Sequence, residues 1–141
     1  MAMALLVSCN GRKSELQVIK TWPDGTPKLV FEYKKGDTID PHYEIHYYRN
    51  GNKRIAGPLK HGLRHGKWQA WFEDGTLWSE GTYVDGKENG MKKIYYPNGN
   101  LYYKGIVTDG QRTGVWEFFD NEGQKIKEVD YDALNNPQEQ D

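Results

Sequence analysis

The chain has 141 residues, of which 36% are hydrophobic and 16 are glycine, so it is long enough for one domain but poor in material for a large two-sided core. Its formal net charge of −1 gives no overall positive field, which argues against nucleic acid as a partner. Aromatic residues, at 13% with ten tyrosines and five tryptophans, carry the apolar area. We therefore expect a core built from rings.

The chain opens with an apolar stretch, residues 1–7 (MAMALLV), that leads to its single cysteine. The segment Leu6-Val7-Ser8-Cys9 resembles a bacterial lipobox, in which a small residue precedes the cysteine that becomes lipidated. No Lys or Arg precedes the apolar residues, and an upstream start would supply both this charge and a longer apolar segment. The resemblance implies that Cys9 carries a lipid anchor and that residues 1–20 are a signal-like N-terminus and tether; the alternative is an ordinary N-terminus with a free thiol.

Glycines then recur every 24 residues along most of the chain. Four series share this spacing: Gly51, Gly75, Gly99 and Gly123; Gly57, Gly81 and Gly105; Gly62, Gly86 and Gly110; Gly66, Gly90 and Gly114. Four series with one period indicate tandem repeats. An earlier copy, Thr21-Trp22-Pro23-Asp24-Gly25, is displaced by two residues, so we predict a repeat array over residues 21–131, followed by a polar tail over residues 132–141.

Each copy combines an aromatic pair, a spacer and usually Asn-Gly or Asp-Gly, as in Trp71-Phe72-Glu73-Asp74-Gly75. These dipeptides between alternating segments predict type I′ hairpin turns, because both central residues of that turn need a positive φ. Gly57, Gly81 and Gly105 fall inside the second strand of a hairpin, where we expect a bulge, a bend or the close approach of a ring. The prediction is an all-β fold: an elongated single-layer antiparallel sheet of tandem hairpins of about 24 residues each.

The copies resemble the MORN-repeat variant of bacterial proteins, including those grouped as YwqK-like antitoxins. The hallmark of this variant is Tyr-Tyr-x-Asn-Gly followed by Gly-x-Tyr-x-x-Gly-x-x-x-Gly. The likeness is carried by Phe72 to Gly75 with Gly81-Thr82-Tyr83-Val84-Asp85-Gly86 and Gly90, and by Tyr95 to Gly99 with Gly105, Gly110 and Gly114. The resemblance implies an interaction module that attaches to proteins or membrane lipids, and the antitoxin label implies a toxin as partner.

Four aromatic residues occupy one equivalent position and alternate onto one strand face: Tyr47, Trp71, Tyr95 and Phe119. Packing between hairpins is one explanation of this row. The other is a binding surface that stacks sugars or grips an extended peptide. We name these four residues the aromatic row and treat them as candidate partner-binding residues.

A basic stretch lies beside the first member of the aromatic row. Between Ile45 and Phe72 there is no Asp or Glu, whereas the stretch contains Arg49, Lys53, Arg54, Lys60, Arg64 and Lys67. We take Arg49, Lys53 and Arg54 as candidate contacts for an anionic partner such as lipid head groups, an acidic protein surface or a polyanionic glycan. The alternative is a solvated hairpin that happens to lack acids.

Catalytic and metal sites are weakly indicated. His42, Glu44 and His46 alternate along one predicted strand, but no fourth ligand is evident, and we expect neither a metal nor a cofactor. Because no catalytic motif is present, we expect a protein without enzymatic activity. The sequence favours a binding module at the bacterial cell envelope with a protein partner, or else an anionic lipid or glycan. The alternative function is an antitoxin, for which a cytoplasmic location is expected.

Overall fold

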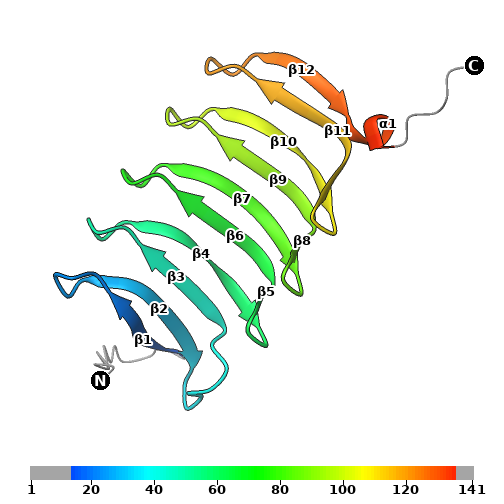
Figure 1. Ribbon diagram of the computed structural model, residues 1–141. Helices are drawn as coiled ribbons and strands as arrows, with labels where there is room; N and C mark the ends of the chain where they lie inside the picture. Colours follow the sequence, from blue (N-terminus) through cyan, green and yellow to red (C-terminus); the bar gives the residue numbers. More distant parts are fainter. Residues whose placement is uncertain (1–13, 136–141) are drawn as a thin grey trace, which may run out of the picture.

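The computed structural model describes residues 14–135, which form one open antiparallel sheet (Figure 1). Its long strands are β1 Ser14–Thr21, β2 Pro27–Lys34, β3 Tyr43–Tyr47, β4 Lys53–Lys60, β6 Gly66–Trp71, β7 Leu77–Val84, β9 Gly90–Tyr95, β10 Leu101–Thr108, β11 Gln111–Phe119 and β12 Lys125–Asp130. The short strands β5 Leu63–Arg64 and β8 Lys87–Glu88 pair with β4 and β7, and helix α1 spans Tyr131–Asn135. Because the long strands lie in chain order across the sheet, the predicted single layer of tandem hairpins is confirmed.

The sheet starts earlier than residue 21. Residues 14–20, which the sequence analysis placed in the tether, form most of β1 and pair with β2 from Ser14 opposite Lys34 to Thr21 opposite Pro27. The strand was not predicted because it precedes the turn at Gly25, which is the only signal of this hairpin in the sequence. Cys9 and the rest of the lipobox-like segment lie outside the described residues.

The polar tail predicted for residues 132–141 begins with a short helix. Residues 131–135 form α1, whose first turn is capped by Oδ1 of Asp130, which accepts hydrogen bonds from N of Asp132 (3.0 Å) and N of Ala133 (3.2 Å). The ring of Tyr131 packs edge-on against Trp116, with 5.7 Å between ring centroids. The helix, which lies beside the last strands of the sheet (Figure 1), therefore contributes a ring that covers the core residue Trp116 of β11.

Two kinds of turn join the strands, and the type I′ turns are not at the predicted places. At Asp74-Gly75 only the glycine has a positive φ (91°), N of Gly75 donates to O of Phe72 (2.9 Å), and N of Phe72 donates to O of Thr76 (2.8 Å). This pattern is a type I turn followed by a glycine bulge. Oδ1 of Asp74 accepts a hydrogen bond from N of Thr76 (2.8 Å), which favours this geometry.

Type I′ turns occur instead at the opposite ends of the strands. Both Asp85 (46°) and Gly86 (86°) have a positive φ there. The same holds for the equivalent pairs His61-Gly62 and Asp109-Gly110. Type I′ was predicted for the first set of turns, and no type was predicted for this second set.

The two faces of the sheet have different cores. Cross-strand partners share a face, so Trp68 lies on the same side as Gly81, and Gln69 on the other side with Glu80. We call the first side the tryptophan face, defined by Trp68, Ala70, Ile94, Tyr103 and Trp116; we call the other the row face, because it carries the aromatic row. Trp68 and Trp116 on the tryptophan face are 2% and 0% exposed. They are the best-buried rings in the described chain.

Two glycines inside the second strands leave the space that these indoles occupy. A methyl group built on Gly57 would lie 2.3 Å from Cδ2 of Trp68, and one on Gly105 would lie 2.2 Å from Cδ2 of Trp116. Each indole Nε1 also donates to a backbone carbonyl, Pro58 O at 2.9 Å and Ile106 O at 3.1 Å. Of the three expectations for Gly57 and Gly105, close approach of a ring is therefore the dominant one.

Neighbouring hairpins alternate, so the packing repeats over two copies. A guanidinium stacks on each indole, with Arg64 4.1 Å from the ring centroid of Trp68 and Arg112 4.4 Å from that of Trp116. A tyrosine closes each group edge-on, Tyr83 beside Trp68 and Tyr131 beside Trp116. We call each Gly-Arg-Trp-Tyr group a tryptophan box. Because Tyr131 is the two-copy equivalent of Tyr83, α1 completes the second box.

The turns alternate with the same two-copy period. Tyr48 Oη donates to O of Trp71, and Tyr96 Oη donates to O of Phe119, both at 2.9 Å. The intervening copy has Phe72 at this position, which has no hydroxyl to donate. Tyrosine hydrogen bonds between adjacent turns of the first kind therefore come from every second copy.

Candidate binding faces of the sheet

The structure places the aromatic row at one equivalent position, as predicted, at the ends of the first strands of four hairpins. Its members close β3, β6, β9 and β11, and all four are half-buried: Tyr47, Trp71, Tyr95 and Phe119. The rings are not stacked on one another, since no ring–ring contact within residues 14–135 joins two of them. The row is therefore a series of separate rings.

The basic stretch is partly neutralised by acidic residues of other parts of the sheet. Arg49 Nε lies 2.8 Å from Asp24 Oδ2, and Lys67 Nζ lies 2.9 Å from Glu80 Oε1. Lys53 is exposed, pairs across the strands with Tyr47, and holds Nζ 6.0 Å from the ring centroid of Trp71. Ion pairs among the described residues include neither Lys53 nor the exposed Arg54. Of the three candidate contacts, only Lys53 and Arg54 keep an uncommitted charge.

The tyrosines of the row stay neutral at physiological pH. Burial raises the pKa of Tyr47, and the carboxylate of Glu32 adds to the effect. Burial likewise raises the pKa of Tyr95, with a second contribution from Glu80. Both hydroxyls therefore remain protonated, and each can donate and accept a hydrogen bond.

The Arg49–Asp24 pair leads to a test at low pH. The pKa of Asp24 falls from 3.8 to about 2, first because Thr26 Oγ1 donates to the carboxylate and second because Arg49 does. Because the folded pKa lies below the unfolded value, this carboxylate stabilises the fold above pH 3.8, and the contribution is lost as the pH falls toward about 2.

We predict that Arg49→Ala raises the pKa of Asp24 while leaving the pKa of Asp74 unchanged. The second carboxylate is the matched control, because its pKa is lowered by the backbone and side-chain groups of Thr76 without a cation. Carboxyl-detected NMR titration of the wild type and the variant measures both. An unchanged pKa of Asp24 would show that the contact with Arg49 does not form in solution.

The three residues considered for a metal are not brought together. His46 Nε2 lies 2.6 Å from Glu44 Oε1, whereas His42 Nε2 lies 3.9 Å from Oε1 of Glu32 on the neighbouring strand. In the described part of the chain, no group of three His, Cys, Asp or Glu residues is placed to hold a metal ion. Glu44 and His46 are instead a hydrogen-bonded pair on β3.

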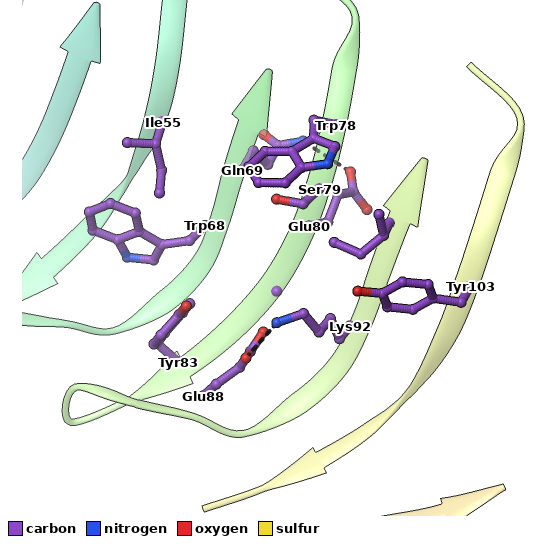
Figure 2. A pocket seen from close by; sticks show the side chains of 12 residues that line it. Ile55, Trp68, Gln69, Trp78, Ser79, Glu80, Tyr83, Glu88, Lys92 and Tyr103 are labelled. Atoms are coloured by element: carbon purple, nitrogen blue, oxygen red, sulfur yellow. Dashed lines mark hydrogen bonds and ion pairs between the residues drawn. The ribbon is translucent and has the colours of Figure 1, made fainter. Parts of the chain in front are cut away.

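A cavity of about 290 Å³ opens on the tryptophan face, and it was not predicted from the sequence. It lies where β7, β8 and β9 meet, beside Trp68 and Tyr83 of the first tryptophan box (Figure 2). Its walls include Trp68, Trp78, Tyr83, Glu88, Lys92 and Tyr103. The available signal was a break in pattern, because Lys92 stands at the position that Trp68 and Trp116 occupy in the neighbouring copies.

Over residues 14–135, the fold and its two faces define a single-layer β-hairpin repeat protein. Three segments match the family model described as MORN repeat variant: residues 64–85, 88–107 and 112–133. The matches begin at the equivalent residues Arg64, Glu88 and Arg112, so they follow the 24-residue period. No curated protein matches the chain.

A similar solved structure is the "Glycosylation Associate Protein (Gap123) complex from Streptococcus agalactiae". The identity is 19% and the TM-score 0.45, over 86% of this chain and 23% of that one. The chain thus spans about a quarter of that protein's length. Within residues 14–135, no helix is long and apolar enough to cross a membrane.

Proposed function

We propose that the chain is a non-enzymatic binding module that holds an extended protein segment along its row face at the bacterial cell envelope. The observation that carries this proposal is the set of four half-buried rings, each at the end of a first strand and each separated from the next. MORN repeats commonly serve as binding modules, which supports this class of function. Rings needed only for cohesion would be expected to contact one another, as those of the tryptophan face do.

The spacing of the row suits an extended chain. Equivalent rings lie two strands apart, which is about 9.6 Å at the usual distance between strands. A polyproline II segment repeats its side-chain direction every three residues, or about 9.3 Å. One side chain of such a segment therefore meets each successive ring, and the pre-extended backbone loses little entropy on binding.

Charge favours an acidic flank on this segment. Lys53 pairs across the strands with Tyr47 and holds its Nζ 6.0 Å from the ring centroid of Trp71, and neither Lys53 nor the adjacent Arg54 has an acidic partner among the described residues. Acidic residues near one end of the bound segment would set its direction and accelerate its association. Anionic lipid head groups and acidic glycans are the other partners that these two cations would attract.

The test is affinity capture from a native bacterial extract with quantitative mass spectrometry. We expect Trp71→Ala with Tyr95→Ala to reduce capture of a specific protein about tenfold. The matched control is Trp22→Ala with Tyr102→Ala, which removes the same two ring types from outside both the row and the cavity described below. Circular dichroism of both double variants controls for folding. Equal loss in both variants, or none in either, would refute binding through the row.

Salt dependence separates the cations from the rings. We expect Lys53→Glu with Arg54→Glu to weaken capture and to flatten its dependence on ionic strength, because surface charge contacts are screened by salt. Binding of anionic vesicles, lost in the same variant while no protein is captured, would point to a lipid partner instead.

Localisation at the envelope depends on Cys9, which lies outside the described residues. Its lipobox-like context supports a lipid anchor that places the sheet on the periplasmic or surface side of a membrane. Labelling with a fatty-acid analogue, comparing the wild type with Cys9→Ala expressed from an upstream start, tests this assignment. Unlabelled wild-type protein would instead favour the alternative of a cytoplasmic antitoxin that binds a toxin.

A further inference from the structure

The strongest unassigned feature is the interrupted pattern between the two tryptophan boxes. Gly57, Arg64 and Trp68 in one box correspond to Gly105, Arg112 and Trp116 in the other. In the copy between them the glycine remains, as Gly81, but the arginine is replaced by Glu88 and the tryptophan by Lys92. We propose that the cavity left at this junction binds one neutral sugar ring of a glycan.

The geometry begins with an ion pair at the base of the cavity. Lys92 Nζ lies 2.8 Å from Glu88 Oε2, and the two side chains are 27% and 18% exposed. Glu88 Oε1 lies 2.7 Å from a methyl group built on Gly81, so the carboxylate enters the space that an indole fills in each box. A carboxylate and an ammonium are smaller than an indole with its stacked guanidinium, which leaves the cavity open.

The walls supply flat apolar surfaces around this pair. Figure 2 shows Trp68 and Tyr83 on one side of the cavity, Tyr103 on the other and Trp78 across one end. Trp78 is 46% exposed, so one side of this ring is accessible from solvent. At about 290 Å³ the cavity stands at the small end of ligand sites, which span roughly 300–1,000 Å³. This size suits a single ring.

The chemistry of the lining distinguishes a sugar from other rings. The opposite charges of Glu88 and Lys92 cancel each other, so a ligand with net charge gains little from the pair. An aromatic ring placed over the pair would remove water from both charges and return no hydrogen bonds. A pyranose replaces that water, because its hydroxyl groups donate to Glu88 and accept from Lys92.

The same ring also satisfies the walls. One face of a pyranose presents C–H groups, which pack on the exposed ring of Trp78 as an apolar surface. The hydroxyl of Tyr103 points toward the cavity and adds a further donor and acceptor (Figure 2). The site lies on the tryptophan face, so it is separate from the protein-binding row face proposed above.

NMR titration of the ¹⁵N-labelled protein tests this site with three probes: methyl β-glucoside, methyl β-galactoside and N-acetylglucosamine. We expect at least one to shift the indole N–H signal of Trp78 and the amide signals of Glu88 and Lys92 saturably, with a Kd on the order of millimolar. No saturable shift up to about 100 mM of any probe would overturn the proposal. N-acetyltryptophanamide is the competing probe, and saturable shifts with it alone would overturn the proposal in favour of an aromatic side chain.

Three variants establish where the sugar binds. Glu88→Arg with Lys92→Trp installs the residues of the flanking boxes, fills the cavity and is expected to weaken binding more than about tenfold. Glu88→Gln with Lys92→Met removes the charges without adding a ring, and it is expected to weaken binding to the same extent. This second variant tests the site even if the first does not fold. Lys93→Met, on the opposite face beside Lys92, is the matched control and should bind as the wild type does. Binding retained in both cavity variants would overturn the assignment.

Discussion

Replacement of Gly105 by alanine is expected to lower the free energy of unfolding by about 2–4 kcal/mol, the range for overpacking that also displaces a buried ring. The added methyl group would lie 2.2 Å from Cδ2 of Trp116, which is 0% exposed. The ring has no room to retreat, because Arg112 stacks on it and Tyr131 packs against its edge. Strain from the backbone does not contribute, since Gly105 has an ordinary negative φ.

The matched control is Gly81→Ala at the equivalent position of the preceding copy. There the nearest atom to the added methyl group is Glu88 Oε1, the mobile end of a side chain, at 2.7 Å. We expect a loss below about 1 kcal/mol, because the carboxylate can rotate away. Urea denaturation followed by tryptophan fluorescence measures both variants. Equal losses would show that the different strand propensities of glycine and alanine, and not the contact with the indole, determine the loss of stability.

Trp68→Ala is expected to cost about 3–5 kcal/mol, the usual range for removal of a buried tryptophan. Trp68 bridges β4 and β6, because its ring covers Gly57 and its Nε1 donates to O of Pro58. The direct ladder between these strands is short, with Ile55 opposite Ala70 and Ala56 opposite Gln69. The ring therefore supplies much of the cohesion at this junction.

Hydrogen exchange should localise that effect. Amide protection is expected to fall in both β4 and β6, because each loses its contact across the junction. Trp78→Ala removes a ring of the same type that is 46% exposed, and we expect a loss below about 1 kcal/mol from it. If the two variants lost equal stability, or if exchange rose only in β6, the bridging role of Trp68 would be wrong.

The alternation of copies explains how one layer supports two surfaces. On the tryptophan face, two boxes hold β4 to β6 and β10 to β11 through rings that contact one another. On the row face, Tyr47, Trp71, Tyr95 and Phe119 remain separate and half-buried. Ring-to-ring packing is therefore concentrated on the tryptophan face, whereas the row face is held by the buried aliphatic residues Val30, Ile45 and Ala56.

Much of the fold was predictable because it depends on local chemistry. Asn-Gly and Asp-Gly mark hairpins through their tolerance of positive φ, and their fixed spacing reports tandem copies. The turn type predicted at Asp74-Gly75 was wrong because a dipeptide alone does not report hydrogen bonds such as that between Asp74 and Thr76. Residues 14–20 were missed because a strand without turn residues of its own becomes visible only through its partner, here β2.

The candidate surfaces, like the fold, were predicted only in part from the sequence. Strand alternation was enough to place the four rings of the row on one face, since side-chain direction along a strand has a period of two. Pairing across strands was needed to show that Asp24 neutralises Arg49 and that Glu80 neutralises Lys67, because these partners come from other strands of the sheet.

The 24-residue pattern of glycines and rings therefore established the repeat, its strands and its alternating faces, because these properties depend on neighbouring residues. The register between strands established the rest: which glycine faces which indole, which cations remain uncommitted, and where Lys92 leaves a cavity. The first two of these facts arise from contacts between residues 10 or more positions apart, and side-chain volumes across a junction become complementary only when the hairpins lie beside each other.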